Sequence, residues 1–215
     1  MIKKIKASTS EKIIFIFIIF LAIFSFGSFL LLKDKCLLVK DFDPKEIKFS
    51  KPENIVVLNV PCGNVVIELY PDISPNGVSR FITLVKSKAY DDIAFHRVIK
   101  DTLVQAGDLE FGKKGNINYG KIGSGKSGLG TINSEVDTAF NFDEGTVGLA
   151  RAQEYNTEDS QFFIILRDEP LYETEYTPIG KVIYGLDALK KIKHLDKSQY
   201  VLRPDYINFI RMLVN

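Results

Sequence analysis

The sequence predicts a mainly β domain, an antiparallel barrel or sandwich, that follows one apolar N-terminal helix. Many short strand-like segments and only two amphipathic helical segments follow residue 32, a pattern typical of antiparallel all-β architectures. The chain of 215 residues is 46% hydrophobic and 26% charged, which excludes disorder, collagen and a disulfide scaffold for the chain as a whole. The part after residue 32 is long enough for one domain with a sizeable core and too short for two ordinary ones.

The first element is the uncharged stretch at residues 13–32. As a helix it would span roughly 30 Å, the thickness of the bilayer core. Lysines at positions 3, 4, 6 and 12 precede it, which predicts that residues 1–12 are cytoplasmic. We expect a single-pass anchor in the cell inner membrane, with the domain on the extracytoplasmic, periplasmic side. A cleaved signal peptide is the alternative, and a buried soluble helix is disfavoured because no polar face exists.

Residues 33–52 are predicted to form a charged linker, and residues 53–215 the folded domain. The linker contains Cys36, whereas Cys62 lies in a Pro-Cys-Gly-Asn turn. A disulfide between them is allowed outside the cytoplasm, but the sequence equally permits two unpaired thiols.

The domain begins with two β-rich runs, 54–60 and 65–70, whose short connection predicts a hairpin. In the second run Val65, Ile67 and Leu69 share one face, which indicates a sheet with one buried side. Ser74 then precedes a helix in which Val78, Phe81, Ile82 and Val85 fall at i, i+3, i+4 and i+7. The remaining predicted elements are strands at 94–99, 103–106, 146–150, 161–166 and 180–183, a short helix at 186–193 and a closing strand at 206–214.

A segment with seven glycines, residues 112–130, is expected to be loop. Within it, Gly120 to Ser127 satisfies the phosphate-binding pattern G-x-x-x-x-G-K-[ST]. That chemistry needs a buried strand before the loop and a helix after it. Neither is predicted here, so we expect no nucleotide. The part after residue 32 carries 24 basic and 26 acidic side chains, and no nucleic-acid partner is expected either.

Several enzyme classes lack their signatures in this sequence. The chain has only two histidines, His96 and His194, with no zinc-binding spacing around them. Ser160 lies in Asp-Ser-Gln rather than in the turn that carries a hydrolase nucleophile. We therefore expect catalysis without a metal, without another cofactor and without a covalent nucleophile.

Four blocks of sequence remain, and together they resemble the cyclophilin family of peptidyl-prolyl cis-trans isomerases. They are Phe95-His-Arg97-Val-Ile with Leu103-Val-Gln105, Gly145 to Ala152, Asp159-Ser-Gln-Phe-Phe-Ile164, and Gly180 to Asp187. The similarity runs in order from about Ile55 to the C-terminus. The sequence as a whole is most similar to bacterial exported members of the family. It implies an eight-stranded antiparallel β-barrel capped by two α-helices.

The resemblance also implies the site. It makes Arg97 the catalytic residue and makes Leu103 and Phe163 the apolar wall of a proline pocket. Gln105 would bind the substrate backbone or position Arg97. Other substrate-binding positions implied are Thr102, Ala150, Arg151, Ala152, Leu171, Tyr172 and Tyr176. Phe162 and Phe163 point to opposite faces of a strand, and the resemblance selects Phe163 for the pocket; His96 is implied to be a structural neighbour.

The physical case for such a site rests on amide resonance, which gives rotation about an X-Pro bond a barrier of about 20 kcal/mol. In the twisted transition state the prolyl nitrogen regains its lone pair. A fixed guanidinium beside it then binds that state more tightly than either planar isomer. Arginine suits this role because its charge is permanent and its donors are rigidly arranged.

Departures from the family pattern modify these expectations. Thr102 stands where relatives usually have a pocket Phe, which predicts weakened activity. Leu171 falls near a Trp that is important for cyclosporin in many eukaryotic relatives, which predicts poor binding of that drug. Ala106 replaces a common Gly. Arg151 replaces a common Asn, which predicts attraction of an acidic residue in the substrate.

The sequence therefore predicts a membrane-tethered isomerase acting on proline-containing segments of unfolded or exported proteins. The alternative is a module on the same fold that binds such segments, as a chaperone does, with little or no turnover.

Overall fold

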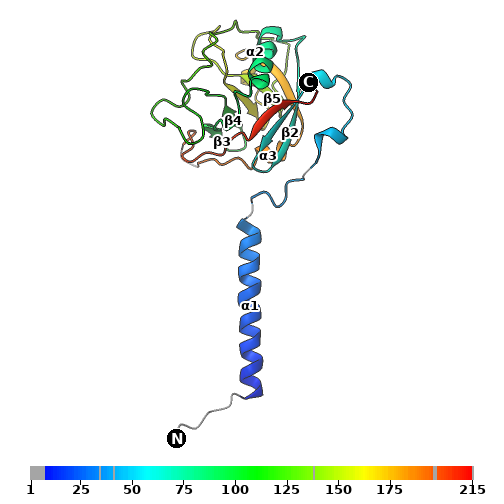
Figure 1. Ribbon diagram of the computed structural model, residues 1–215, viewed down its shortest axis with the longest axis vertical. Coiled ribbons are helices and arrows are strands. Elements are labelled where there is room, and N and C mark those ends of the chain that lie inside the picture. The colour runs from blue at the N-terminus through cyan, green and yellow to red at the C-terminus, as the bar shows by residue number, and fades with distance from the viewer. Residues whose placement is uncertain (1–7, 34, 41, 138, 196–197, 215) are drawn as a thin grey trace. The chain divides into compact units, whose positions relative to one another are not determined.

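The computed structural model in Figure 1 describes residues 8–33, 35–40, 42–137, 139–195 and 198–214. The chain divides into two units, Met1–Leu38 and Val39–Asn215. The first unit holds helix α1, and the second holds the strands and the remaining helices. Of the segment 1–12, which was expected to be cytoplasmic, residues 1–7 lie outside the described residues.

Helix α1, Thr9–Lys33, includes the uncharged stretch that was predicted to be helical. A capping box begins it, because the Ser8 amide donates to the Glu11 carboxylate at 2.6 Å and the Glu11 amide donates to the Ser8 hydroxyl at 3.3 Å. Its segment Thr9–Phe29 has a mean hydropathy of 2.4 and is not buried. The helix is thus long and apolar enough to cross a bilayer, and a signal sequence would share both properties.

The second unit is built on a curled antiparallel sheet of eight strands in the order β3-β4-β6-β5-β7-β2-β1-β8. The strands are β1 Ile55–Val60, β2 Gly63–Leu69, β3 Arg97–Ile99, β4 Leu103–Ala106, β5 Thr146–Leu149, β6 Phe162–Ile165, β7 Pro178–Tyr184 and β8 Phe209–Met212. Isolated bridges from Arg97 to Tyr200 and from Ala94 to Tyr206 join the segment before β8 to the β3 end of the strand order. The eight-stranded antiparallel prediction is confirmed.

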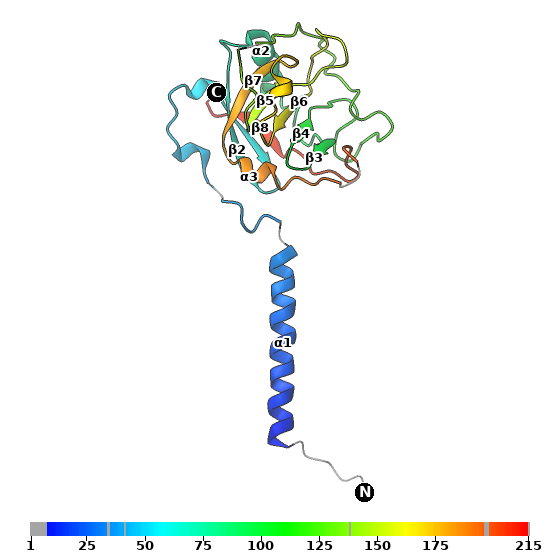
Figure 2. The ribbon, with the colours of Figure 1, turned by 180° about the vertical axis from the view of Figure 1, so that it is seen from behind.

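Helix α2, Pro75–Lys86, and helix α3, Leu186–Leu189, lie at opposite ends of the sheet (Figures 1 and 2). Ser74 precedes α2 as predicted, but its hydroxyl donates to the Pro178 carbonyl at 2.5 Å. The Glu135 carboxylate instead accepts from the amides of Asn76 at 3.1 Å and Gly77 at 2.8 Å, which satisfies the free donors of the first turn.

Helix α3 is shorter than the predicted 186–193. The Lys193 amide donates to the Asp205 carboxylate at 2.8 Å rather than to a helix carbonyl. The helix has already ended before this contact, because the Lys191 and Ile192 amides donate to carbonyls only three residues back, those of Ala188 and Leu189.

Three short 3-10 helices, each beginning at a proline, were not predicted: η1 Pro44–Glu46, η2 Pro52–Asn54 and η3 Pro170–Tyr172. Proline favours the first turn because its fixed φ suits it and its missing N–H is not needed there. The first of them, η1, lies in the segment expected to be a linker, and η2 begins at its last residue. The Phe42 and Phe49 rings of that segment contact Tyr184 of β7. Cys36 and Cys62 are both disulfide-bonded, so the alternative of two thiols does not describe the structure.

The two faces of β6 serve different purposes. Phe162 packs edge-on against Phe81 of α2 and against Tyr90, with ring centroids 5.3 Å and 5.4 Å away. Phe163 points the other way, where its ring meets Tyr172 and Tyr176. The first aromatic therefore belongs to the core beneath α2, and the second is available to a site on the opposite face.

The glycine-rich segment 112–130 is loop, as predicted; between β4 and β5 the described residues contain no helix or strand of the sheet. The Gly123 and Gly125 amides donate to the buried Asp108 carboxylate at 2.6 Å and 3.0 Å. These donors of the phosphate-binding sequence pattern are thus already bound to an internal anion.

Candidate active site

Arg97, Gln105 and Phe163 form one row across the sheet. Arg97 pairs with Gln105, and Gln105 pairs with Phe163 on the next strand. Directly opposed residues of antiparallel strands project to the same face. The row continues to Gly148, where an added Cβ would approach the Phe163 ring to 2.6 Å. Only a glycine therefore leaves room for Phe163 on this face.

Two glutamines hold the half-buried Arg97 guanidinium. Its Nε donates to Oε1 of Gln199 at 2.9 Å, and its Nη1 donates to Oε1 of Gln105 at 3.1 Å. These two bonds fix the plane of the guanidinium, which has five N–H donors.

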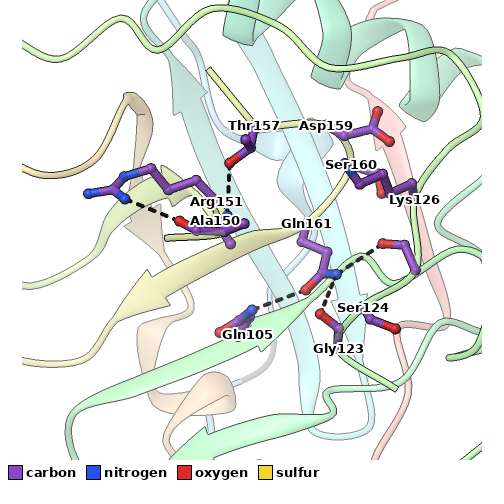
Figure 3. Close-up of a pocket in the computed structure, with 12 residues that line it drawn as sticks. Gln105, Gly123, Ser124, Lys126, Ala150, Arg151, Thr157, Asp159, Ser160 and Gln161 are labelled. Atoms are coloured by element: carbon purple, nitrogen blue, oxygen red, sulfur yellow. Dashed lines mark hydrogen bonds between the residues drawn. The ribbon is translucent and has the colours of Figure 1, made fainter. Parts of the chain in front are cut away.

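A third glutamine fixes the orientation of Gln105. Nε2 of Gln161 donates to the carbonyls of Gly123 and Gly125, both at 3.0 Å, so Oε1 of Gln161 faces Gln105 (Figure 3). Gln105 donates to that oxygen from Nε2 at 3.1 Å, which leaves its own oxygen for Arg97. The chain of amides thus runs from the glycine-rich loop to the guanidinium.

An apolar wall lies beyond Gln105 on the face of the sheet that carries Arg97. Leu103 and Phe163 are 1% and 3% exposed, and the Phe163 ring lies 5.6 Å from that of Tyr172 and 5.0 Å from that of Tyr176. Phe142, which the sequence analysis did not select, stacks behind Phe163 with centroids 6.3 Å apart. Burial raises the pKa of Tyr172, against the opposing effect of Arg97, so its hydroxyl is neutral at physiological pH.

The guanidinium and the wall line a single cavity of about 300 Å³, which we call the Arg97 cavity. It brings together most of the predicted site residues and adds others that were not predicted. Its lining consists of Arg97, Leu103, Gln105, Gly123, Ala150, Arg151, Phe163, Tyr172, Tyr176, Gln199 and Tyr200.

Three predicted substrate-binding residues lie outside this lining. Thr102 sits in the β3 to β4 turn, where its hydroxyl donates to the Lys100 carbonyl at 3.2 Å. Leu171 is 80% exposed on η3. Ala152 lines only a neighbouring cavity of about 290 Å³. The short Thr102 side chain is bonded to Lys100 within this turn and supplies no wall to the Arg97 cavity.

Arg151 lines the Arg97 cavity but carries no uncompensated charge. Its Nη2 forms an ion pair with Glu175 at 2.6 Å, and its guanidinium lies 4.3 Å over the Tyr155 ring. Only 8% of its side chain is exposed. Glu175 already neutralises Arg151 in the structure without substrate, and the expected attraction of an acidic substrate residue stays a prediction.

His96 is buried directly before Arg97, and among the described residues neither of its ring nitrogens forms a hydrogen bond of standard geometry. Burial lowers the pKa of His96 to about 4, so the imidazole is neutral at physiological pH. It is absent from the lining of the Arg97 cavity, in keeping with a structural role. Among the described residues, no group of three or more His, Cys, Asp or Glu side chains could hold a metal ion.

Gln161 and Gln199 are the functional candidates that the sequence analysis missed. Gln161 lies within the Ser-Gln-Phe-Phe-Ile block, so the block itself could have drawn attention to it. Gln199 carries no local signal, because its contact with Arg97 joins residues that are 102 positions apart.

Comparison with known proteins identifies relatives over most of the chain. A family model described as "Cyclophilin type peptidyl-prolyl cis-trans isomerase/CLD" matches residues 55–211. A Brucella suis protein named "Probable peptidyl-prolyl cis-trans isomerase" is 41% identical over 162 residues, covering 74% of this chain and 82% of the relative. "Peptidyl-prolyl cis-trans isomerase-like 3" of Gallus gallus is 31% identical over 154 residues, covering 69% of this chain and 88% of the relative.

Solved structures share the fold. A Cryptosporidium parvum cyclophilin type peptidyl-prolyl cis-trans isomerase, crystallised in the presence of the dipeptide Ala-Pro, matches with a TM-score of 0.65 and 26% identity. The match covers 75% of this chain and 99% of that one. Cyclophilin AquaCyp293 from Hirschia baltica, at 21% identity, has a TM-score of 0.62 and covers 75% of this chain and 74% of its own. With the family model spanning most of the sequence, this chain belongs to the cyclophilin-type peptidyl-prolyl cis-trans isomerases.

Proposed function

We propose that this isomerase catalyses X-Pro rotation in the Arg97 cavity, with Arg97 as the catalytic residue, in proline-containing segments of unfolded or exported proteins. The observation that carries the proposal is that one oriented guanidinium and the buried apolar pair Leu103 and Phe163 line a single cavity. A proline ring against that wall would bring its nitrogen toward the guanidinium.

The guanidinium acts on the transition state rather than on the substrate. In a planar imide the prolyl nitrogen has no lone pair to accept a hydrogen bond, whereas in the twisted form it does. A donor that is already oriented by Gln105 and Gln199 needs no rearrangement when that lone pair appears. Each tenfold increase in rate requires about 1.36 kcal/mol of such selective stabilisation.

The apolar wall contributes by holding the ring and excluding water. Phe163 and Leu103 offer apolar surface on one side, and the rings of Tyr172 and Tyr176 flank them. A drier site strengthens the interaction between the guanidinium and the developing lone pair. We assign the backbone of residues 150–152 to contacts with the residue before the proline, because Ala150 and Arg151 line the cavity just beyond the end of β5.

We further propose that α1 anchors the enzyme in the inner membrane and that the domain acts on the periplasmic side. The length and hydropathy of α1 and the basic residues before it support this topology. A phosphatase reporter that is active only outside the cytoplasm, fused to the C-terminus, should be active in cells. Cytoplasmic activity of a matched reporter would contradict the topology, and loss of α1 from the mature protein would show it to be a signal sequence.

Turnover separates the isomerase from a binding module on the same fold. The full chain in detergent micelles is mixed with a proline tetrapeptide, and exchange between its cis and trans forms is followed by NMR. We expect exchange well above the uncatalysed rate. Peptide shifts without faster exchange would favour the binding module.

A further inference from the structure

A groove at the start of the second unit is separate from the Arg97 cavity. Residues of the predicted linker form one side of it, and the end of β7 with the start of α3 forms the other. It has a volume of about 380 Å³, and we call it the linker groove. Its lining consists of Val39, Lys40, Phe42, Ile47, Tyr184, Gly185, Leu186 and Asp187.

The linker side of the groove is fixed to the sheet. The centroid of the Phe42 ring lies 6.0 Å from that of the Tyr184 ring. Nδ2 of Asn64 in β2 donates to the Phe42 carbonyl at 3.3 Å. The turn that follows, η1, is also held, because its Pro44 is buried. The groove is therefore a preformed part of the second unit.

Most of this lining is apolar, and part of it is exposed. Tyr184 is 46% exposed and Ile183 beside it is 36% exposed, although the rest of their strand is mostly buried. Lys40 and Asp187 are exposed and carry opposite charges, so the lining has no net charge. Contiguous exposed apolar surface is typical of a site that another apolar surface covers.

The groove begins a few residues after the end of α1. Lys33 ends this helix and is the first charged residue after the uncharged stretch 13–32. The six residues from there to Val39 span at most about 22 Å when fully extended, which is less than the roughly 30 Å of the bilayer core. Leu37 and Leu38, directly before Val39, are 53% and 87% exposed. With α1 in a bilayer, the linker groove therefore begins close to the membrane surface.

We propose that the linker groove binds the interfacial layer of the phospholipid bilayer, where headgroups meet acyl chains, and so docks the second unit on the membrane surface. The inference rests on the proposed function, because it assumes that α1 is an anchor. Tyr184 suits this layer, since its ring is apolar and its hydroxyl can stay in water. A short tether gives an effective concentration of about millimolar, so even weak docking is populated.

Docking should depend on apolar contact rather than on charge. Since Lys40 and Asp187 cancel, the groove should bind neutral phosphatidylcholine, and high salt should have little effect. This expectation distinguishes the groove from a basic patch, which would need anionic lipid and would lose its attraction in salt.

The test uses tryptophan fluorescence, because the sequence contains no tryptophan. Tyr184→Trp therefore gives the full chain a single reporter in the groove. The variant is reconstituted into phosphatidylcholine vesicles whose acyl chains carry bromine near the headgroup, since bromine quenches a tryptophan that it contacts. We expect a strong loss of emission relative to unbrominated vesicles. Phe42→Trp, on the other side of the groove, is a second reporter and should show the same loss.

Tyr155→Trp is the matched control, because Tyr155 is 47% exposed and Tyr184 is 46% exposed. Its segment is joined to α2 by the ion pair of Asp159 with Arg80, and α2 and α3 lie at opposite ends of the sheet (Figure 1). The control should keep its emission. Adding Leu186→Glu to Tyr184→Trp should restore emission there, because a carboxylate opposes entry into an apolar layer.

Equal emission losses for Tyr184→Trp and Tyr155→Trp would overturn the inference, because a unit that merely hangs on its tether has no preferred face. A Tyr184→Trp emission that shifts to the blue without quenching would mean that a second copy covers the groove, which also overturns it. Flotation of the vesicles separates this failure from that of the anchor. Protein that does not float with the vesicles overturns both proposals, whereas floating protein with an unquenched reporter overturns only the docking.

Discussion

Arg97 and Gln105 face each other across β3 and β4, and Nη1 of Arg97 donates to Oε1 of Gln105 at 3.1 Å. Gln105 cannot turn its amide without losing its bond to Gln161, which is itself fixed by two loop carbonyls. The position of the guanidinium therefore depends on an ordered set of neutral side chains. Such an arrangement orients a cation without neutralising it.

Removing the Gln105 side chain should leave the Arg97 guanidinium less firmly oriented. We expect Gln105→Ala to lower kcat/KM by about tenfold, because one hydrogen bond to a charged group contributes about 1.5 kcal/mol. The loss should fall mainly on kcat, since the apolar wall is intact. Lys100→Ala, at an exposed position in the neighbouring turn, serves as the control in the same NMR exchange assay. Equal activity of the two variants would contradict a positioning role for Gln105.

Substitutions of the two adjacent phenylalanines of β6 should have different effects on peptide binding but similar effects on stability. Both are buried, but Phe163 lines the Arg97 cavity and Phe162 packs beneath α2. Phe163→Leu should weaken peptide binding several-fold, whereas Phe162→Leu should leave kcat/KM per folded molecule unchanged. Each should lower the free energy of unfolding by about 1–2 kcal/mol. Denaturant unfolding and peptide titration of both variants check this, and equal effects on binding would count against the assignment.

His96 should make the domain sensitive to mild acid. Its pKa is lowered to about 4 by burial, below the ordinary value near 6.5. Between these values the unfolded state binds the proton more readily, so stability falls as the pH drops from 6.5 toward 4. The pKa difference lowers the free energy of unfolding by about 3 kcal/mol once the pH is below both pKa values, and by about 2 kcal/mol at pH 5.

Urea unfolding at pH 7.5 and at pH 5 tests this expectation against His96→Leu. The variant should lose less stability than the native protein over that interval, because only its carboxylates then titrate. Parallel losses in the two proteins would show that His96 does not carry the effect.

The fold was largely predictable because its signals are local. Alternating apolar residues marked the hairpin, and an apolar stripe beginning at Val78 marked α2. The end of α3 was not predicted, since the Lys191 and Ile192 amides bond three residues back rather than four although the local sequence still favours a helix. The cap of α2 was not predicted either, because Glu135 supplies it from a distant loop.

The site was predictable to the extent that motifs place residues on adjoining strands. Arg97, Gln105 and Phe163 meet because the register aligns them. The environment of each side chain was less accessible to sequence reasoning. Arg151 was expected to attract acidic substrates, yet its ion pair with Glu175 depends on the path of the chain after β6.

The central claim is that Arg97 favours the twisted imide over its planar forms. Its most direct test compares native enzyme, Arg97→Lys and Arg97→Ala in cis-trans exchange and in peptide affinity on the full chain. Loss of one preorganised donor to a transition state costs about 3–4 kcal/mol. We predict that Arg97→Ala lowers kcat/KM by about a hundredfold or more, that Arg97→Lys recovers part of it, and that peptide affinity changes little. Exchange catalysed by Arg97→Ala at the native rate would contradict the account.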